Sequence, residues 1–511
     1  MEHFTKVSWR NAWPAAMLAA ATILLIAPLW CVSVPALPDY PAHIASFWLI
    51  GGGHSSFYNV HWVFAPNLAS EILVPLLARL TGLAAAAKIF LSLGVALWVL
   101  GAGAVQRALI GRITIAPLIG AVFAYNENFF WGFFNYYFAA GLSLAVFAAW
   151  IIAVPGARRT IAFTLLVIIV YFFHIFAAAA LLVMIAGFET MRGIEQHDIL
   201  RRARSVFLIY LPAALAFFFL MPHGGDTTIA FNLSDTMLDR FESLSLRHFD
   251  DPTWALPILI GALLLLSLIF GRARIVPHMF AGLAILLVAA LVAPEDAMGG
   301  WGVHLRLPAL FAILLLASTE IKLTARAALP LAALMLIVIG WTAFNLAGNW
   351  RGYDAQVAEF RAALPFIPKQ TRLVTVLDGN AIGEGPDQPY WHMAEWAIMD
   401  RGAMTALMFT TRGQHVIWLK LPNDRFAAAT ADQGMPPDIA QLTDLARGKN
   451  VHDPIIGNDL SYLRYFPCHY DEALVVHLNG ARSPVPALLK LRHQGSFFAL
   501  YDILPSGCAE P

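Results

Sequence analysis

The chain has 511 residues, of which 59% are hydrophobic and only 13% are charged. Soluble domains carry about 25% charged residues, so this composition excludes an ordinary soluble protein and predicts a membrane protein. Lysine and arginine number 33, as do aspartate and glutamate, so the net charge of zero gives no indication of a nucleic-acid partner.

The first apolar run extends over residues 14–34, behind Lys6 and Arg10. A secretory signal has an apolar stretch of about 7–15 residues, whereas about 20 are needed to cross a bilayer. The run therefore predicts an uncleaved first membrane span, with the N-terminus in the cytoplasm.

Further apolar runs follow, and several of them are shorter than a full crossing requires. The sequence therefore predicts an α-helical polytopic membrane protein with about eleven transmembrane or half-membrane helices. Their expected ranges are 14–34, 84–106, 113–126, 133–154, 161–173, 175–188, 205–222, 254–271, 275–293, 306–319 and 328–347.

The stretch 161–188 decides the expected topology. A single helix would put His174 at its middle, whereas two short helices that turn at His174 place nearly all basic loop residues on one side. Because positively charged loops stay in the cytoplasm, the two-helix interpretation is preferred. The external segments are then 35–83, 126–132, 223–253 and the chain after residue 348.

Two of these external segments contain predicted structure. Residues 66–82 are apolar with Glu71 and Arg79, which predicts an amphipathic helix at the membrane interface. Residues 349–511 have the mixed composition of a soluble α/β domain, so we divide the chain into a membrane domain, 1–348, and this external domain. Its expected strands are 372–379, 413–421 and 496–504, and its expected helix is 437–448.

Cys468 and Cys508 both fall in the external domain. In an oxidising compartment they can form a disulfide, but two separate thiols fit the sequence equally well. The cysteine spacing is not that of a metal site.

Asp39 and His43 follow the first span in VPALPDYPAHIASFWLI, residues 34–50. Pro38 and Pro41 stiffen the chain around them. If Pro41 opens a short helix, Asp39 lies at its N-cap, and helix capping then explains this carboxylate as well as function does. The alternative is a general base that takes a proton from an acceptor hydroxyl at the membrane surface, with His43 beside the substrate.

Polar residues interrupt aromatic ones in YNENFFWGFFNYYF, residues 125–138. A turn with a flanking belt of interfacial aromatic residues accounts for this pattern. The functional alternative is that Glu127 faces the same cavity as Asp39, as a second carboxylate or as a ligand of sugar hydroxyls, with Asn126 also binding substrate.

Basic side chains at the external ends of spans are candidates to bind a phosphate, which needs charge and forked donors. Arg306 lies in GGWGVHLRLP, residues 299–308, with His304 beside it, while His174 lies at the predicted turn and Arg79 is a lesser candidate. Each has a structural alternative. Arg306 can extend towards lipid headgroups, and His174 can satisfy backbone groups at the helix break.

His392 and Glu395 are three residues apart in PYWHMAEWAIMDRGA, residues 389–403. This spacing puts both side chains on one face of a helix. With only two ligand-type side chains, a surface pair is preferred over a metal site, and no metal ligand is predicted.

Together these features resemble the GT-C superfamily of membrane glycosyltransferases. The shared features are an acidic residue after the first span, an interfacial helix before the second, short helices with external polar turns, and an external C-terminal domain. LPDYPAHIA, residues 37–45, resembles the first-loop motif of bacterial members, and HMAEWAIMDRGA, residues 392–403, resembles a segment of their outer domain. The architectural resemblance covers most of the chain, and the motifs cover a small part of it.

The resemblance implies packed helices in a bacterial inner membrane, with an active site and a C-terminal domain on the periplasmic side. It also implies a sugar carried on polyprenyl phosphate, inversion at the sugar carbon, and a lipid, glycan or protein acceptor. Asp39 matches the first-loop acidic position and Glu127 the place of the second-loop acidic residue. However, no second acid adjoins Asp39, and Asn126 and Asn128 flank Glu127. Metal dependence therefore stays open, with no cofactor assigned and a divalent cation as the one candidate.

Three functions are compared on this basis. In a glycosyltransferase, Asp39 activates the acceptor, Arg306 and His174 stabilise the departing lipid phosphate, and Glu127 holds the sugar. The alternative is a transporter or flippase of a lipid-linked or anionic envelope substrate, although the paired repeats of many transporters are not evident in this sequence. A structural subunit with a degenerate site is the third. If Asp39, Glu127, His174 and Arg306 line one cavity, the enzyme is favoured.

Overall fold

The computed structural model describes most of the chain, namely residues 9–220, 229–231, 240, 243–244, 255–297, 300–379, 389–421, 423–431, 434–451, 460–478, 483–504 and 508. Lys6 and most of the predicted loop 223–253 lie outside these residues.

Each apolar run predicted as a span coincides with a helix or with consecutive short helices. Within the described part of the chain, six helices are long and apolar enough to cross a membrane: α1 (Trp9–Trp30), α4 (Leu83–Ile110), α7 (Phe134–Ile152), α9 (Ile175–Gln196), α10 (Ile199–Leu220) and α15 (Ala325–Ala363). The remaining runs form α5 (Ala116–Gly120) with the 3-10 turn Ala121–Ala124, α8 (Ala157–Phe173), α12 (Leu256–Ile269), α13 (Phe280–Val292) and α14 (Val303–Ala317). The protein is therefore an α-helical polytopic membrane protein.

The predicted turn at His174 is present. The backbone of His174 is extended, with φ −167° and ψ 126°, and it separates α8 from α9. Both helices pack against α10, so the chain reverses direction at this residue. The second helix is longer than the predicted 175–188, because Glu189, which ends the apolar run, is itself buried and paired with Arg159 and Arg202.

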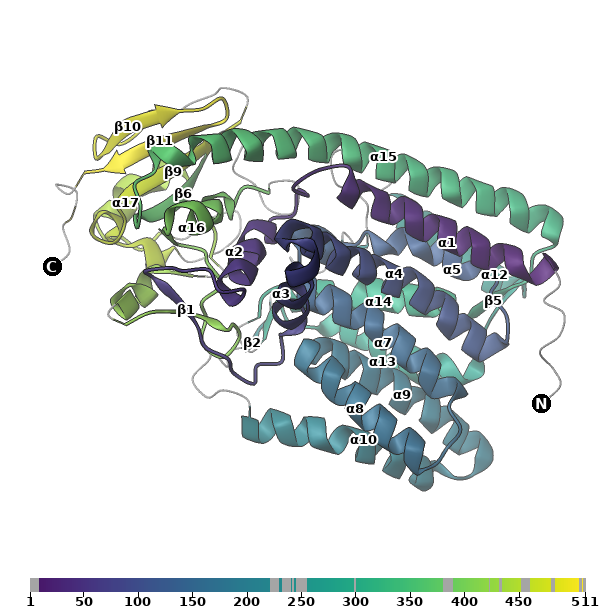
Figure 1. Cartoon of the computed structure of the whole chain (residues 1–511). Helices are drawn as coiled ribbons and strands as arrows, with labels where there is room; N and C mark the ends of the chain where they lie inside the picture. Colours follow the sequence, from purple (N-terminus) through teal and green to yellow (C-terminus); the bar gives the residue numbers. More distant parts are fainter. Residues whose placement is uncertain are drawn as a thin grey trace.

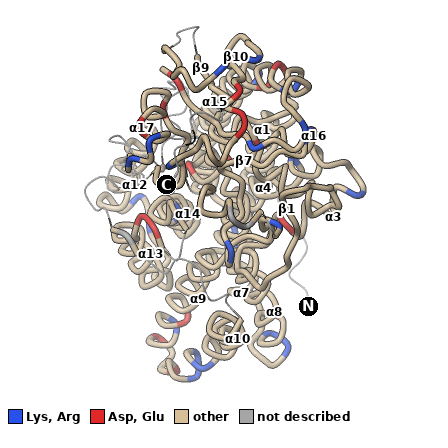
Figure 2. Tube along the Cα trace, turned by 90° about the vertical axis from the view of Figure 1, so that its left-hand side faces the viewer, with Lys and Arg blue, Asp and Glu red and all other residues tan. Residues whose placement is uncertain are grey.

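Small residues allow close helix packing, and large apolar residues cover the outside. A Cβ on Gly187 of α9 would lie 2.4 Å from the Cα of Gly282 on α13, so only glycine permits this crossing. Phe219, Leu263 and Ile337, on α10, α12 and α15, are more than half exposed, as expected of side chains that face lipid. Basic residues gather beside the ends of α8 and α10 (Figure 2), the side predicted to be cytoplasmic.

The C-terminal part is an α/β domain, as predicted. Its five-stranded sheet has the order β10-β11-β9-β6-β7, in which β6 is parallel to β9 and β7 while β11 is antiparallel to its two neighbours. The bounds are β6 (Arg372–Asp378), β7 (Met404–Thr405), β9 (Glu472–His477), β10 (Leu489–Gln494) and β11 (Phe498–Ile503), with short helices α16 (Trp396–Arg401), α17 (Leu442–Ala446) and α18 (Phe466–His469). The predicted strands 372–379 and 496–504 correspond to β6 and β11, and the predicted helix 437–448 contains α17.

The predicted strand 413–421 is shorter and pairs elsewhere. Only β8 (Ile417–Leu419) forms, and it is antiparallel to β1 (Tyr58–Val60) of the first external segment. That segment also holds α2 (Tyr40–Ile50) and α3 (Ala69–Thr81), the predicted amphipathic helix. The first external segment and the C-terminal domain therefore form one continuous structure.

The helix α15 joins the two halves of the molecule. It runs along the helical bundle and reaches the C-terminal sheet (Figure 1), so the predicted domain boundary at residue 348 falls inside an unbroken helix. Its Asp354 accepts hydrogen bonds from the backbone N–H groups of Ser33 (2.7 Å) and Val34 (3.0 Å), which fixes the chain just before Asp39. Farther along, Cys468 and Cys508 form a disulfide, the first of the two alternatives left open by the sequence.

Candidate active site

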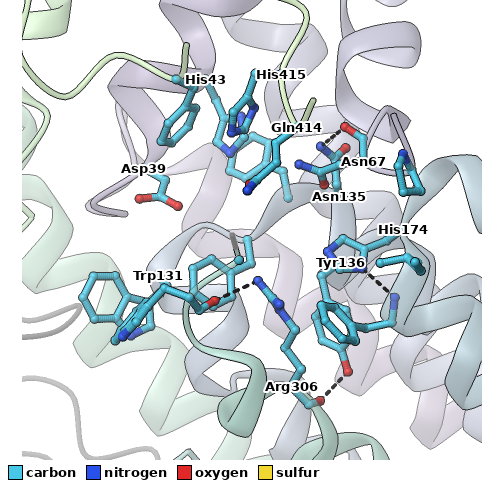
Figure 3. A pocket seen from close by; sticks show the side chains of 18 of the residues that line it. Asp39, His43, Asn67, Trp131, Asn135, Tyr136, His174, Arg306, Gln414 and His415 are labelled. Carbon is cyan, nitrogen blue, oxygen red and sulfur yellow. Dashed lines mark hydrogen bonds between the residues drawn. The ribbon is translucent and has the colours of Figure 1, made fainter. Parts of the chain in front are cut away.

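A cavity of about 200 Å³ lies where the loop after α1, the break at His174, the start of α14 and the C-terminal domain meet (Figure 3). Its lining combines titratable, amide and aromatic side chains. The principal lining residues are Asp39, His43, His174, Arg306, His392 and His415, the amides Asn67, Asn135 and Gln414, and the aromatic residues Trp131, Phe133, Phe134, Tyr136, Phe176, Trp301, Trp391 and Phe409.

Backbone contacts hold Asp39 at the wall of this cavity. Its N–H donates to the carbonyl of Trp131 (3.2 Å), and its carbonyl accepts from the N–H of His43 (3.0 Å). Gly132 lies behind it with φ 90°, and a Cβ there would be 3.1 Å from the Cβ of Asp39, so a larger residue would crowd the aspartate. Asp39 occupies the N-cap position of α2, but its carboxylate accepts no capping hydrogen bond. Capping therefore does not explain this side chain.

The charge state of Asp39 suits proton transfer. Burial raises the pKa of Asp39 from its ordinary 3.8 to about 6, and the imidazoles of His392 and His415 limit this rise. A base whose pKa lies close to the working pH can take up and release a proton in each turnover. Burial also lowers the pKa of His43 to about 3, so this imidazole, stacked on Phe134 at 4.5 Å, is uncharged.

Arg306 reaches into the same cavity from α14. Its Nη2 donates to the carbonyl of Trp301 (3.0 Å), whereas its buried Nε and Nη1 have no hydrogen-bond partner in the described part of the chain. Within the described residues the guanidinium makes no ion pair, and it lies 5.1–5.8 Å from the ring centres of Phe133, Tyr136 and Phe176. A buried cation with unused forked donors is typical of a site that binds an anion.

His174 and Arg306 are fixed by the same neighbours. The Nδ1 atom of His174 accepts a hydrogen bond from the N–H of Phe176 (3.2 Å), which places the proton of the neutral imidazole on Nε2. Tyr136 packs edge-on against this ring at 5.2 Å, and its hydroxyl donates to the backbone carbonyl of Arg306. The cavity therefore offers a guanidinium and an imidazole N–H in a fixed arrangement.

Tryptophan residues form one wall of the cavity. Trp131 packs edge-to-face against Trp301 (4.9 Å between ring centres) and Trp391 (5.5 Å). The buried indole N–H groups of Trp131 and Trp391 have no hydrogen-bond partner among the described residues. Flat apolar rings with unused N–H donors suit a ligand that has both C–H faces and oxygen atoms, as a sugar does.

The other predicted site residues do not line this cavity. The side chain of Asn126 accepts the N–H of Asn128 (3.0 Å) and so caps the short helix α6 (Glu127–Trp131). Neither Glu127 nor the buried His304 is among the lining residues, and Arg79 lines a second cavity of about 920 Å³ between α2 and α3. The predicted roles of these four residues gain no support from their positions.

The prediction of a surface pair at His392 and Glu395 is wrong. Both side chains are buried, because residues 389–395 fold over the cavity, and His392 faces Asp39 at 3.7 Å. The spacing was visible in the sequence, but nothing local showed that this segment packs against residues some 350 positions earlier. Gln414 and His415 were missed altogether, because they lie in a loop without a motif. Within the described residues, no three metal-ligand side chains converge.

No family model and no curated protein matches the chain. Two solved structures of ArnT from Cupriavidus metallidurans are similar to it. One, bound to undecaprenyl phosphate, has 12% identity, covers 98% of this chain and 100% of its own, and gives a TM-score of 0.49. The other, in the apo state, has 13% identity, 99% and 100% coverage and a TM-score of 0.48. A similarity of this size carries no conclusion about activity.

Proposed function

We propose that the protein is a membrane glycosyltransferase that moves a sugar from a polyprenyl-phosphate donor to a hydroxyl of a lipid, glycan or protein acceptor. The observation that carries the proposal is that Asp39 and Arg306, far apart in sequence, line one cavity (Figure 3). Sugar transfer from a lipid phosphate needs a base for the acceptor and a cation for the leaving group. This cavity holds both.

The proposed reaction is an inverting displacement at the sugar carbon. Asp39 takes the proton of the acceptor hydroxyl, and the electron pair of that oxygen forms the new bond to the anomeric carbon. The bond from this carbon to the phosphate oxygen breaks with its electron pair on the phosphate. Arg306 and the Nε2–H of His174 stabilise the resulting charge, as preorganised donors do for a developing anion.

The surroundings support the same assignment of substrates. The tryptophan wall provides stacking surfaces and N–H donors for the sugar ring. The cavity is small and partly open, so we place the sugar phosphate inside it and the polyprenyl chain along the apolar helices outside. We infer that the cavity faces the periplasm, because the disulfide of the C-terminal domain requires an oxidising compartment.

The test is transfer by membranes that contain the full chain or its Asp39→Asn variant. The probes are undecaprenyl-phosphate-linked ¹⁴C-labelled hexoses and pentoses, tested one at a time, and incorporation into membrane lipid, glycan and protein is counted. We expect transfer from at least one probe and a loss of about 10²–10⁴-fold in Asp39→Asn, the usual contribution of a general base.

Asp400→Asn is the matched control, because Asp400 is exposed and pairs only loosely with Arg361 at 3.9 Å. It should transfer like the parent chain. Full activity of Asp39→Asn would refute the catalytic assignment. Movement of a lipid-linked probe across proteoliposomes without any covalent product would instead establish the transporter.

A further inference from the structure

The C-terminal domain extends a histidine and a glutamate to the back of Asp39. The Nε2 atom of His392 lies 3.7 Å from Oδ1 of Asp39, and the Nδ1 atom of the same ring lies 3.5 Å from Oε1 of Glu395. The two carboxylates are thus on opposite edges of one imidazole. Asp39 comes from the loop after the first span, whereas His392 and Glu395 come from the segment before α16, so the row joins both halves of the molecule.

The burial of Glu395 has no evident structural reason. Its side chain is 1% exposed, its Oε2 has no hydrogen-bond partner, and the contact with His392 is its one ion pair within the described residues. It precedes α16, yet it makes no side-chain capping bond to that helix. A buried carboxylate is costly unless it has a partner that needs it. Here that partner is the imidazole facing Asp39.

We propose that His392 and Glu395 are positioning residues for Asp39 and relay its proton, so that the C-terminal domain completes the active site. The proposal rests on the glycosyltransferase function given above. Once the contact between them closes on substrate binding, Glu395 accepts the Nδ1–H of His392 and thereby holds the lone pair of Nε2 towards Asp39. This is the way a carboxylate selects the tautomer of a histidine behind a reacting group.

One proton passes through the site in each cycle. The acceptor O–H bond breaks, and its proton passes to the carboxylate of Asp39 while the phosphate leaves with the electron pair of the sugar–oxygen bond. The proton then moves from Asp39 to Nε2 of His392, and the imidazolium stands between two carboxylates. Water in the cavity takes the proton up, and Asp39 is again a base.

The distances from His392 to Asp39 and to Glu395 are consistent with a proton transfer that occurs only when substrate is bound. Both contacts are longer than a hydrogen bond, and a closure of about 0.5 Å at each would form one. Catalytic hydrogen bonds are often long in an unliganded site and shorten once substrate is bound. Trp391, which precedes His392, and Phe409, whose ring packs edge-on against that of His392 at 5.2 Å, also line the cavity and would move with such a closure.

The test compares His392→Gln and Glu395→Gln with His477→Gln in the transfer assay on the full chain. Gln fills similar space but neither takes up nor releases a proton, and His477, buried on β9 beside Gln494, is a matched histidine of the same domain that does not line the cavity. We expect kcat to fall by about 10–100-fold in both cavity variants, with KM for the undecaprenyl-phosphate sugar within about twofold. His477→Gln should keep the parent kcat.

Two further readouts separate a relay from a packing role. The double variant should be no slower than His392→Gln alone, because residues that act as one unit are not additive. The acid limb of the rate–pH profile should also shift in His392→Gln, because Asp39 and His392 share a proton in the parent chain and Asp39 titrates alone in the variant. The other groups near Asp39, namely His43, His415 and Arg306, are unchanged in this comparison.

Each outcome has a defined meaning. Parent-like kcat and pH profile in His392→Gln, while Asp39→Asn is inactive, would overturn the relay and leave the proposed function standing. Independent, additive losses in His392→Gln and Glu395→Gln would overturn it as well. If His392→Gln does not fold, the nearly isosteric Glu395→Gln decides alone by its kcat and KM. Full activity of Asp39→Asn would remove both proposals.

Discussion

Two buried clusters of charge lie near opposite ends of α9, and they are built in opposite ways. At the end that carries Glu189, every carboxylate oxygen is used. Oε1 accepts from Trp150 (2.9 Å) and Arg159 (3.1 Å), and Oε2 accepts from Arg202. Fifteen residues earlier, His174 belongs to the cavity, where two donor atoms of Arg306 have no partner among the residues that the structure describes.

The difference separates a cluster whose charges are all paired from one that leaves hydrogen-bonding groups available to a ligand. Glu189 connects α7, α8, α9 and α10 and has no capacity left for a ligand. In the cavity, Asp39 and Arg306 face a common space but make no ion pair with each other within the described residues. An arrangement that leaves buried charges apart costs stability, and such a cost is typical of a site awaiting substrate.

The largest expected effect is on the structural cluster. Glu189→Ala leaves Arg159 and Arg202 without their shared partner, and breaking a buried charge pair costs about 3–5 kcal/mol. Thermal unfolding of the purified protein in detergent should show a lower Tm, while the transfer rate per folded molecule stays that of the parent. Glu195→Ala is the control on the same helix, because its contact with His278 is exposed to solvent and contributes little to stability. Equal losses in the two variants would refute the structural role.

Arg306→Gln should show the reverse pattern. Loss of a preorganised donor to a departing anion lowers kcat by about 10²–10³-fold, whereas Tm should hold or rise because an unpaired buried cation is removed. Arg306→Lys keeps the charge but not the forked donors, so its kcat should lie between those of the parent chain and Arg306→Gln. Arg112→Gln, at an exposed ion pair with Glu320, is the control. A lower Tm with parent-like transfer and parent-like binding of undecaprenyl phosphate would place Arg306 with Glu189, among the structural residues.

The sequence predicted much of this comparison, because some of its determinants are local. Apolar runs and the bias of basic loops predicted the helices and the turn at His174. The acidic residue after the first span and the arginine that enters α14 were also identifiable by chemistry and position. By contrast, the apolar run ended at Glu189, because hydropathy counts a glutamate as polar whether or not arginines of neighbouring helices neutralise it.

Non-local packing set the limit of prediction. His392 and Glu395 had a visible spacing, yet their burial depends on a domain that folds back over α2. Residues 413–421 were expected to form a strand of the C-terminal domain, but their partner is β1, far earlier in the chain. Glu127 and Asn126 carry groups of the kind that bind sugars, but neither lines the cavity, and the side chain of Asn126 caps α6 instead. The burial of His392 and Glu395 and the pairing of β8 depend on contacts between distant segments, which composition and periodicity do not encode.

The transfer rate should depend on pH through Asp39, by about tenfold per pH unit. The raised pKa of Asp39, about 6, predicts that transfer falls roughly tenfold per unit below pH 6 as the base becomes protonated. The sign for stability is opposite. An acid whose pKa is higher folded than unfolded binds its proton more tightly in the fold, so acidification from pH 7 to 5 should raise the contribution of Asp39 to Tm. Asp39→Asn should lack this contribution, measured as the difference in Tm between the two proteins at each pH. A difference independent of pH would contradict the assignment.

The smallest expected effect is a change in the number of thiols that can be modified, which reports the side of the membrane that each cluster faces. Cys31, Cys468 and Cys508 are the three cysteines of the chain, and the last two are joined. If the cavity faces the oxidising periplasm and Glu189 the cytoplasm, a maleimide–polyethylene glycol added after denaturation without reductant should modify one thiol per chain, and after reduction three. Chains made in cells that lack periplasmic disulfide formation should show three in both cases. Three modified thiols without reductant in ordinary cells would mean that the C-terminal domain is made in a reducing compartment. The cavity would then face the cytoplasm, and the positive charge around Glu189 would lie on the outside, against the rule that positive loops stay within.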